Sequence, residues 1–244
     1  LFSVLFTSCI STKDLMYLQN KGNTDSSNVV ASNIKPYRLQ TNDILNVTIK
    51  ALDERLVEMF NNTSRAQLSP TIESLFFNGY TIDDHGNIRI PVLGEVNVLG
   101  FTVEEVRKKI EEQLLKDYFK KEAQLFVNVK LAGFRYTVNG EVVNPGSKIL
   151  YQDKVNILEA IANSGDITVT GDRKDVVVIR QFPQGAETFK IDLTDANAMK
   201  SNVYYLQPND YIYINPLKQK TWGTRKTGIE SVGSRVTILS LATT

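Results

Sequence analysis

The sequence predicts an α+β protein with two domains, and three observations lead to that class. Short runs in which apolar and polar residues alternate indicate strands that bury one face. Two amphipathic stretches with start signals for helices lie among these strands, one beginning near residue 102 and one near residue 156. The chain has 244 residues, which is enough for two modest domains with cores of their own.

The first group of strands surrounds a turn rich in Asp and Gly. Tyr80–Ile82 and Asn87–Ile90 are predicted strands, joined by Asp-Asp-His-Gly at positions 83–86, a composition that favours chain reversal. Pro91 removes a backbone donor and ends the second strand. A third strand follows, in which Val96 and Val98 alternate with polar residues.

A helix is predicted immediately afterwards, from about Thr102 to Tyr118. Thr102 is suited to cap it, and Glu105, three residues on, completes a capping box. Glu104 with Lys108, and Glu105 with Lys109, have the spacing and order of ion pairs across one turn. The apolar residues recur at helical spacing and predict one buried face: Val103, Val106, Ile110 and Leu114.

The second half of the chain predicts more strands around one short helix. Asn156 and Glu159 form a second capping box, and Gly165 ends the helix. Asn139-Gly140 is a hairpin signal. Strands are predicted at 123–131, 176–180, 187–192 and 203–206, with Tyr211 and Tyr213 on one face of a later strand and Ile212 and Ile214 on the other.

One short sequence occurs in both halves of the chain. Leu39-Gln-Thr-Asn-Asp43 recurs as Leu206-Gln-Pro-Asn-Asp210, and an apolar strand follows each time. We interpret both as the same turn, in which the Asp side chain accepts a hydrogen bond from a nearby backbone amide. A pair of cation ligands is a weaker interpretation, because no further carboxylates have the spacing of a calcium loop.

Composition narrows the classes of function. The 28 basic and 27 acidic residues nearly balance, so the charge offers no general attraction to nucleic acid. The single histidine, His85, lies beside two Asp residues, but a lone turn histidine is far more often a solvated surface residue than a catalytic or metal-binding one. No phosphate loop, nucleophile elbow or zinc spacing occurs. The sequence therefore predicts a protein that is not an enzyme and uses no cofactor or metal.

The order of the motifs resembles the outer-membrane polysaccharide export lipoproteins of the Wza type. The match rests on the strand-turn-helix passage 80–114 and on an opening strand at 37–47, where Asn42-Asp43 stands in place of the usual Gly-Asp. The later Val-Asn-Gly-Glu-Val at 138–142 and the helix ending Ala-Asn-Ser-Gly resemble the β-grasp-like SLBB domain that follows in the family. Ser164-Gly165-Asp166 replaces the usual Ala-Gly-Gly.

The N-terminal residues resemble the end of a bacterial lipoprotein signal peptide. An apolar run leads to Thr7-Ser8-Cys9, which is similar to a lipobox, and Cys9 is the only cysteine. The alternative is a buried strand with a free thiol. We expect a signal-peptide remnant at 1–8, a lipid-anchored tether at 9–34, a polysaccharide export domain at 35–132, an SLBB domain at 133–216 and a C-terminal segment at 217–244, with the true N-terminus missing.

The C-terminal segment is a candidate amphipathic helix. Its apolar residues have helical spacing and follow a Trp, a residue common at membrane interfaces, and they form a candidate membrane or oligomer stripe: Trp222, Ile229, Val232, Val236 and Leu239. In the family, such helices line a pore through the outer membrane. The stripe is short for a bilayer span, so packing on the chain's own domain or on another subunit is the alternative.

The resemblance implies an outer-membrane lipoprotein that faces the periplasm and forms an oligomeric conduit for capsular polysaccharide or exopolysaccharide. It implies a ring of identical subunits, with an inner-membrane polysaccharide co-polymerase as partner and the turn at 83–86 as a candidate subunit contact. The rival hypothesis is a monomeric periplasmic lipoprotein that binds a glycan or acts as a scaffold. For either function Tyr211 and Tyr213 are weak candidates for saccharide contact, because aromatic rings commonly hold sugars.

Overall fold

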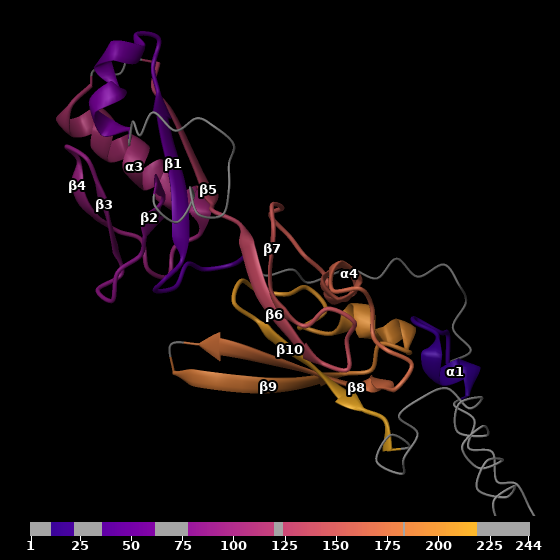
Figure 1. Ribbon diagram of the computed structural model, residues 1–244. Coiled ribbons are helices and arrows are strands. Elements are labelled where there is room, and N and C mark those ends of the chain that lie inside the picture. Colours follow the sequence, from indigo (N-terminus) through magenta and orange to yellow (C-terminus); the bar gives the residue numbers. More distant parts are fainter. Residues whose placement is uncertain (1–10, 22–35, 62–77, 120–123, 183, 219–244) are drawn as a thin grey trace, which may run out of the picture. The chain divides into compact units, whose positions relative to one another are not determined.

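The computed structural model describes residues 11–21, 36–61, 78–119, 124–182 and 184–218, and these fall into two compact units (Figure 1). The first unit comprises residues 35–134 with 150–153. The second is built from segments on both sides of it in the sequence, 1–34, 135–149 and 154–244. Both units combine helices with sheets, so the predicted α+β class is confirmed.

The first unit contains a three-stranded antiparallel sheet, a hairpin and one long helix. The central strand β1 pairs with β5 from Leu45 to Lys50, and its first two residues pair with β2. Two short 3-10 helices follow β1 directly. The elements are β1 (Ile44–Lys50), η1 (Glu54–Leu56), η2 (Glu58–Phe60), β2 (Tyr80–Thr81), β3 (Asn87–Ile90), β4 (Gly94–Asn97), α3 (Val103–Asp117) and β5 (Phe126–Leu131).

Helix α3 begins as the sequence predicts and buries the predicted face. Thr102 and Glu105 exchange both bonds of the capping box, and Val106, Ile110 and Leu114 are fully buried. The predicted pairing of Glu104 with Lys108 is wrong. Arg107 takes Glu104 instead, with its Nη2 2.7 Å from Glu104 Oε1, because the planar guanidinium reaches carboxylates on both neighbouring turns.

The second unit is built on a five-stranded sheet in the order β7-β6-β10-β8-β9. β10 lies at its centre, parallel to β6 and antiparallel to β8. Helix α4 has the predicted capping box of Asn156 and Glu159. The elements are α1 (Thr12–Leu15), β6 (Phe134–Gly140), β7 (Gly146–Leu150), α4 (Ile157–Asn163), β8 (Gly171–Phe182), β9 (Gly185–Ile191), η4 (Ala196–Lys200) and β10 (Tyr211–Pro216).

Two local predictions in this unit are wrong. Asn139-Gly140 does not form a hairpin turn but ends β6, beside β10. Gly140 has φ +91°, and a Cβ there would lie 2.1 Å from the carbonyl oxygen of Ile214, so the residue serves a close approach of two strands. Residues 203–206 are not a strand. Only an isolated bridge joins Tyr205 to Asn156.

The repeated turn is confirmed, and its two copies have the same geometry. Asn42 and Asn209 both have left-handed backbones, with φ of 67° and 68°. The Asp43 carboxylate accepts from the backbone amide of Gln40 at 2.9 Å, and Asp210 accepts from that of Gln207 at 2.7 Å. Each turn leads into the central strand of its sheet.

The two buried carboxylates have different second partners. The Tyr37 hydroxyl donates to Asp43 at 2.7 Å. Arg180 holds Asp210 through two bonds, from Nε at 2.9 Å and from Nη2 at 2.7 Å, and both side chains are buried. Burial raises the pKa of Asp210 above its ordinary value, although the Arg180 guanidinium opposes that rise. The bidentate geometry keeps this pair together inside the sheet's buried face.

Asp210→Ala tests how much the Arg180–Asp210 pair contributes to the stability of the fold. The substitution leaves the Arg180 guanidinium buried without its carboxylate, so we expect it to lower the free energy of unfolding by about 3–5 kcal/mol. Lys190→Ala is the matched control, because the Lys190–Asp175 pair is exposed and contributes less than about 1 kcal/mol. Urea denaturation followed by circular dichroism measures both. Equal losses in the two variants would contradict the argument.

Candidate functional site

The Asp-Asp-His turn of the first unit serves structure rather than chemistry. Asp83 Oδ1 accepts from the backbone amides of His85 at 2.9 Å and Asn87 at 2.8 Å, which closes the turn. Across the described ranges, the structure shows no group of three or more His, Cys, Asp or Glu side chains placed to hold a metal ion. Residues 83–85 of the turn are exposed, and its role as a subunit contact stays a prediction.

Tyr211 and Tyr213 lie on one side of the five-stranded sheet, opposite the side that packs into the core. Alternation along β10 buries Ile212 and Ile214 completely, and the two tyrosines project to the opposite side, with Tyr213 37% exposed. The buried side is covered by α4, since the Tyr136 hydroxyl on β6 donates to the carbonyl of Ala160 at 3.3 Å. We call the side of this sheet that carries Tyr211 and Tyr213 the open face.

Hydrogen bonds hold the polar side chains of the open face in place. The Asn139 amide donates to the Tyr211 hydroxyl at 2.9 Å, and its oxygen accepts from the amide of Gly140 at 2.8 Å. The hydroxyls of Thr137 and Ser147 lie 2.9 Å apart, one strand further out. The Tyr211 ring is therefore oriented by a fixed amide.

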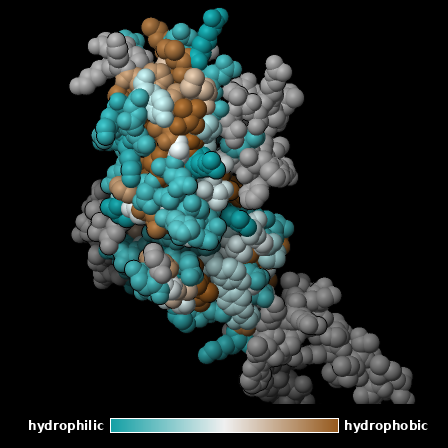
Figure 2. Space-filling model, turned by 90° about the vertical axis from the view of Figure 1, so that its left-hand side faces the viewer, coloured by the Kyte–Doolittle hydropathy of each residue, from teal (hydrophilic) through white to brown (hydrophobic). Residues whose placement is uncertain are grey.

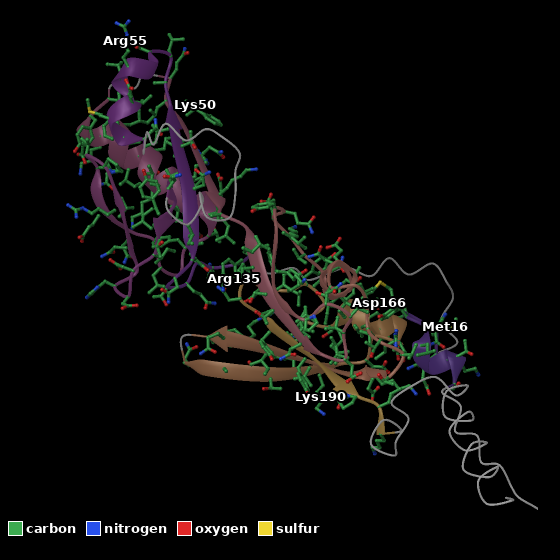
Figure 3. All side chains as sticks on the ribbon, viewed as in Figure 1. Met16, Lys50, Arg55, Arg135, Asp166 and Lys190 are labelled. Carbon is green, nitrogen blue, oxygen red and sulfur yellow. The ribbon has the colours of Figure 1, made fainter. Side chains whose placement is uncertain are left out.

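The strands on the other side of β10 give the open face an aliphatic strip and a second polar margin. Val177 and Ile179 on β8 lie opposite Tyr213 and Tyr211. Thr188 and Lys190 lie opposite these two on β9. Lys190 is paired with Asp175 at 2.9 Å, and Figure 3 shows it on the side of the sheet away from α4.

Residues 11–21 pack on the second unit, and we call this segment the clip. After α1, the clip runs beside residues 193–196, where Leu18 donates to the carbonyl of Leu193 at 3.0 Å and Gln19 to that of Thr194 at 2.8 Å. Ala196 donates in return to the carbonyl of Gln19 at 3.1 Å. The clip therefore adds a short parallel bridge to a unit that lies mainly beyond residue 134.

Tyr17 is the central side chain of the clip. Its hydroxyl donates to Asp166. Its ring lies over the guanidinium of Arg173, 5.3 Å from the ring centroid, a contact worth about 0.5–2 kcal/mol. Arg173 is buried and donates to the carbonyls of Ile167 at 2.8 Å and Thr168 at 3.2 Å. Burial raises the pKa of Tyr17, with the bond to Asp166 adding to the rise.

Ion pairs lie on both sides of Tyr17. Lys174 Nζ lies 2.6 Å from Asp14, and Lys21 Nζ lies 2.9 Å from Asp192. Burial by itself raises the pKa of Asp192, but hydrogen bonds from Thr194 and Lys21 outweigh it and hold the pKa below the ordinary value of 3.8. The carboxylate of Asp192 is thus ionised at neutral pH and pairs with Lys21.

Sequence reasoning missed the clip, because its residues show neither strand alternation nor a helical stripe. We expected residues 9–34 to form a tether, whereas 11–21 are docked through contacts with residues about 150 positions away. A lone Tyr among polar residues carries no signal of such partners.

The second exposed apolar region lies on the first unit, beside η1 and η2. Val57 and Phe60 turn into the core, while Leu52, Leu56 and Met59 are at least half exposed. Nearby, the centroids of the Phe60 and Tyr118 rings lie 5.2 Å apart, and the Tyr118 hydroxyl donates to the carbonyl of Val92. Figure 2 shows hydrophobic side chains gathered there. We call Leu52, Leu56, Met59, Val92 and Tyr118 the apolar patch.

Two predicted sites fall outside the described residues. Cys9 is one, and the stripe of Trp222, Ile229, Val232, Val236 and Leu239 is the other. Helices long and apolar enough to cross a bilayer are absent from the part of the chain that the structure describes.

Comparison with known proteins identifies both units. The family model for polysaccharide biosynthesis/export proteins matches residues 31–130, and the SLBB domain model matches residues 135–214. Residues 31–130 are thus similar to polysaccharide biosynthesis/export proteins, and residues 135–214 to SLBB domains. This confirms the resemblance seen in the sequence, so the first unit is the export domain and the five-stranded unit is the SLBB domain.

Two curated relatives match the chain. Both are named EPS I polysaccharide export outer membrane protein EpsA, one from Ralstonia nicotianae (strain ATCC BAA-1114 / GMI1000) and one from Ralstonia solanacearum. Each is 29% identical over 149 residues, which is 59% of this chain and 39% of the relative. The matched stretch thus spans about two fifths of each relative. The family and these relatives are named for export and not for catalysis.

Tyr17→Ala tests the clip on the SLBB domain. Removing the ring exposes Arg173 and deletes the bond to Asp166, so we expect the amides of Leu18, Gln19 and Ala196 to exchange hydrogen at least about tenfold faster. Hydrogen exchange followed by mass spectrometry measures this. Met16→Ala, an exposed neighbour in the same segment, should leave the exchange unchanged. Unchanged protection in Tyr17→Ala would show that the ring does not hold the clip.

Lys21→Met tests the electrostatics of the clip. Because Lys21 helps to lower the pKa of Asp192, its loss should raise that pKa toward 3.8, as measured by carboxyl carbon NMR. The stabilisation from this pair is present above the unfolded pKa and is lost as the pH falls through the lower, folded pKa. Lys13→Met, which removes a charge from the same segment, should not move the titration. An unmoved pKa in Lys21→Met would refute the pairing.

Proposed function

We propose that this protein is an outer-membrane lipoprotein that exports extracellular or capsular polysaccharide through an oligomeric conduit. The observation that carries the proposal is the order of the two domains, an export domain followed by an SLBB domain. Polysaccharide export and the outer membrane both appear in the names of the two relatives.

The proposed anchor is a lipid on Cys9. A lipidated cysteine carries acyl chains that contribute about 0.8 kcal/mol for each buried methylene, so the attachment is firm. Ser11, where the described part of the clip begins, follows Cys9 by two residues. Two residues span at most about 7 Å, so a lipid at Cys9 is joined to the SLBB domain by a short connection.

The proposed conduit is a closed ring of identical subunits facing the periplasm. Such a ring needs contacts between two different faces of each subunit. The apolar patch of the export domain supports this, since Leu56 and Met59 leave apolar surface uncovered after Val57 and Phe60 have filled the core. By analogy with the family, an inner-membrane polysaccharide co-polymerase is the partner that supplies the polymer.

Transport by this design follows from geometry. The protein contributes an enclosed polar path, and the synthesis machinery drives the polymer along it. The C-terminal stripe is proposed to line or support the conduit, either in the membrane or between subunits.

Deleting the gene in the producing cell tests the function. We expect surface polysaccharide to disappear, as assayed by extraction and sugar analysis, and to return with the full-length wild-type gene. Cys9→Ser should fail to restore it and should move the protein out of the membrane fraction. Ser11→Ala, a small polar residue two positions away, should restore both. Normal surface polysaccharide in the deletion strain would refute the proposal.

Light scattering on the full-length lipidated protein in detergent tests the conduit itself. We expect a closed oligomer at micromolar concentration. A strict monomer that binds glycan tightly and saturably would refute the conduit and favour the rival, a monomeric glycan-binding lipoprotein.

A further inference from the structure

The open face of the SLBB domain combines flat aromatic rings with fixed polar groups. Tyr211 and Tyr213 project side by side from the central strand, about 6.6 Å apart along it. Hydroxyl and amide groups lie on neighbouring strands: Thr137, Asn139, Ser147 and Thr188. The face thus offers ring surfaces and hydrogen-bonding groups within one sheet.

Contacts within the open face fix the orientation of its polar side chains, which suits the binding of a polar ligand. Asn139 donates to the Tyr211 hydroxyl, so the ring is oriented before any ligand arrives. Lys190 is paired with Asp175, and Arg135 lies near the start of β6, at one end of the face. The centre of the face is therefore uncharged and rich in oxygen and nitrogen atoms.

The polar groups around the tyrosines favour a saccharide as the ligand. Val177 and Ile179 are half-buried between the tyrosines and the polar margin of β9. Tyrosine is common at protein interfaces as well, so the choice rests on the hydroxyl and amide groups that surround the two rings. Sugars present a different surface, with apolar C–H faces and polar hydroxyl edges, and Tyr side chains match both because each has an apolar body and a polar tip.

We propose that the open face binds the polysaccharide chain as it passes, with the rings of Tyr211 and Tyr213 against the sugar faces and Asn139 and Thr188 against the sugar hydroxyls. This inference rests on the proposed export function and names the ligand class of the SLBB domain. A flat sheet face encloses little of a ligand, so each contact is weak, and a polymer moves along it without being trapped.

The test is saturation-transfer NMR on the full-length protein. The probe is a set of oligosaccharides made by partial hydrolysis of the surface polysaccharide of the producing cell. We expect transfer from protein to sugar in the wild type and at least a fivefold loss in the double variant Tyr211→Ala/Tyr213→Ala. Tyr213→Phe, which keeps the ring, should retain most of the signal.

Tyr151→Ala is the matched control, because Tyr151 is an exposed tyrosine outside the five strands of the sheet, and it should not change the signal. Circular dichroism establishes that the double variant is folded. If it is not, Tyr213→Ala alone serves, since its side chain is the more exposed of the two, and a twofold loss is expected. Undiminished transfer in the folded variant overturns the proposal.

The same variants also test whether the open face binds a second copy of the chain instead of a saccharide. If the double variant changes the oligomer seen by light scattering while saturation transfer stays constant, the open face joins subunits and the proposal fails. The export function is judged separately by the deletion strain. Loss of surface polysaccharide on deletion, together with unchanged transfer in the double variant, rejects the saccharide face and leaves the export function standing.

Discussion

A buried aspartate sets the start of the central strand in each domain. Asp43 precedes β1 and Asp210 precedes β10, and each caps the amide of the residue three positions earlier. The same left-handed Asn comes just before each Asp. Because these strands are central, their neighbours on both sides take their register from them. Burying a carboxylate without hydrogen-bond partners would lower the stability of the fold. The bonds from Tyr37 to Asp43 and from Arg180 to Asp210 offset that cost.

The residue at which β10 begins also determines which of its side chains are exposed on the surface of the SLBB domain. Strand alternation has a period of two, so a shift by one residue would bury Tyr211 and Tyr213 and expose Ile212 and Ile214. The turn at 206–210 fixes the entry point of the strand, and the close approach at Gly140 fixes its pairing with β6. The side of the sheet on which the two tyrosines lie is therefore a consequence of core packing.

The clip joins the beginning of the chain to the SLBB domain, although the export domain lies between them in sequence. Three backbone bonds, a ring over a buried guanidinium and two ion pairs hold eleven residues in place. Exposed ion pairs contribute little individually, so most of the stabilisation comes from the backbone bonds and from Tyr17. The clip begins two residues after Cys9, the proposed site of the lipid.

The sequence by itself determined the local features whose causes are local. Four features depend on residues that are close together in the sequence. They are both capping boxes, the buried face of α3, the left-handed backbone of Asn42 and the alternation of β10. The tertiary structure alone decided the role of Gly140, the absence of a strand at 203–206 and the docking of the clip. These depend on which segments meet in space. A residue such as Tyr17 finds Asp166 and Arg173 only after the SLBB sheet has formed, so no pattern near it in the sequence records the contact.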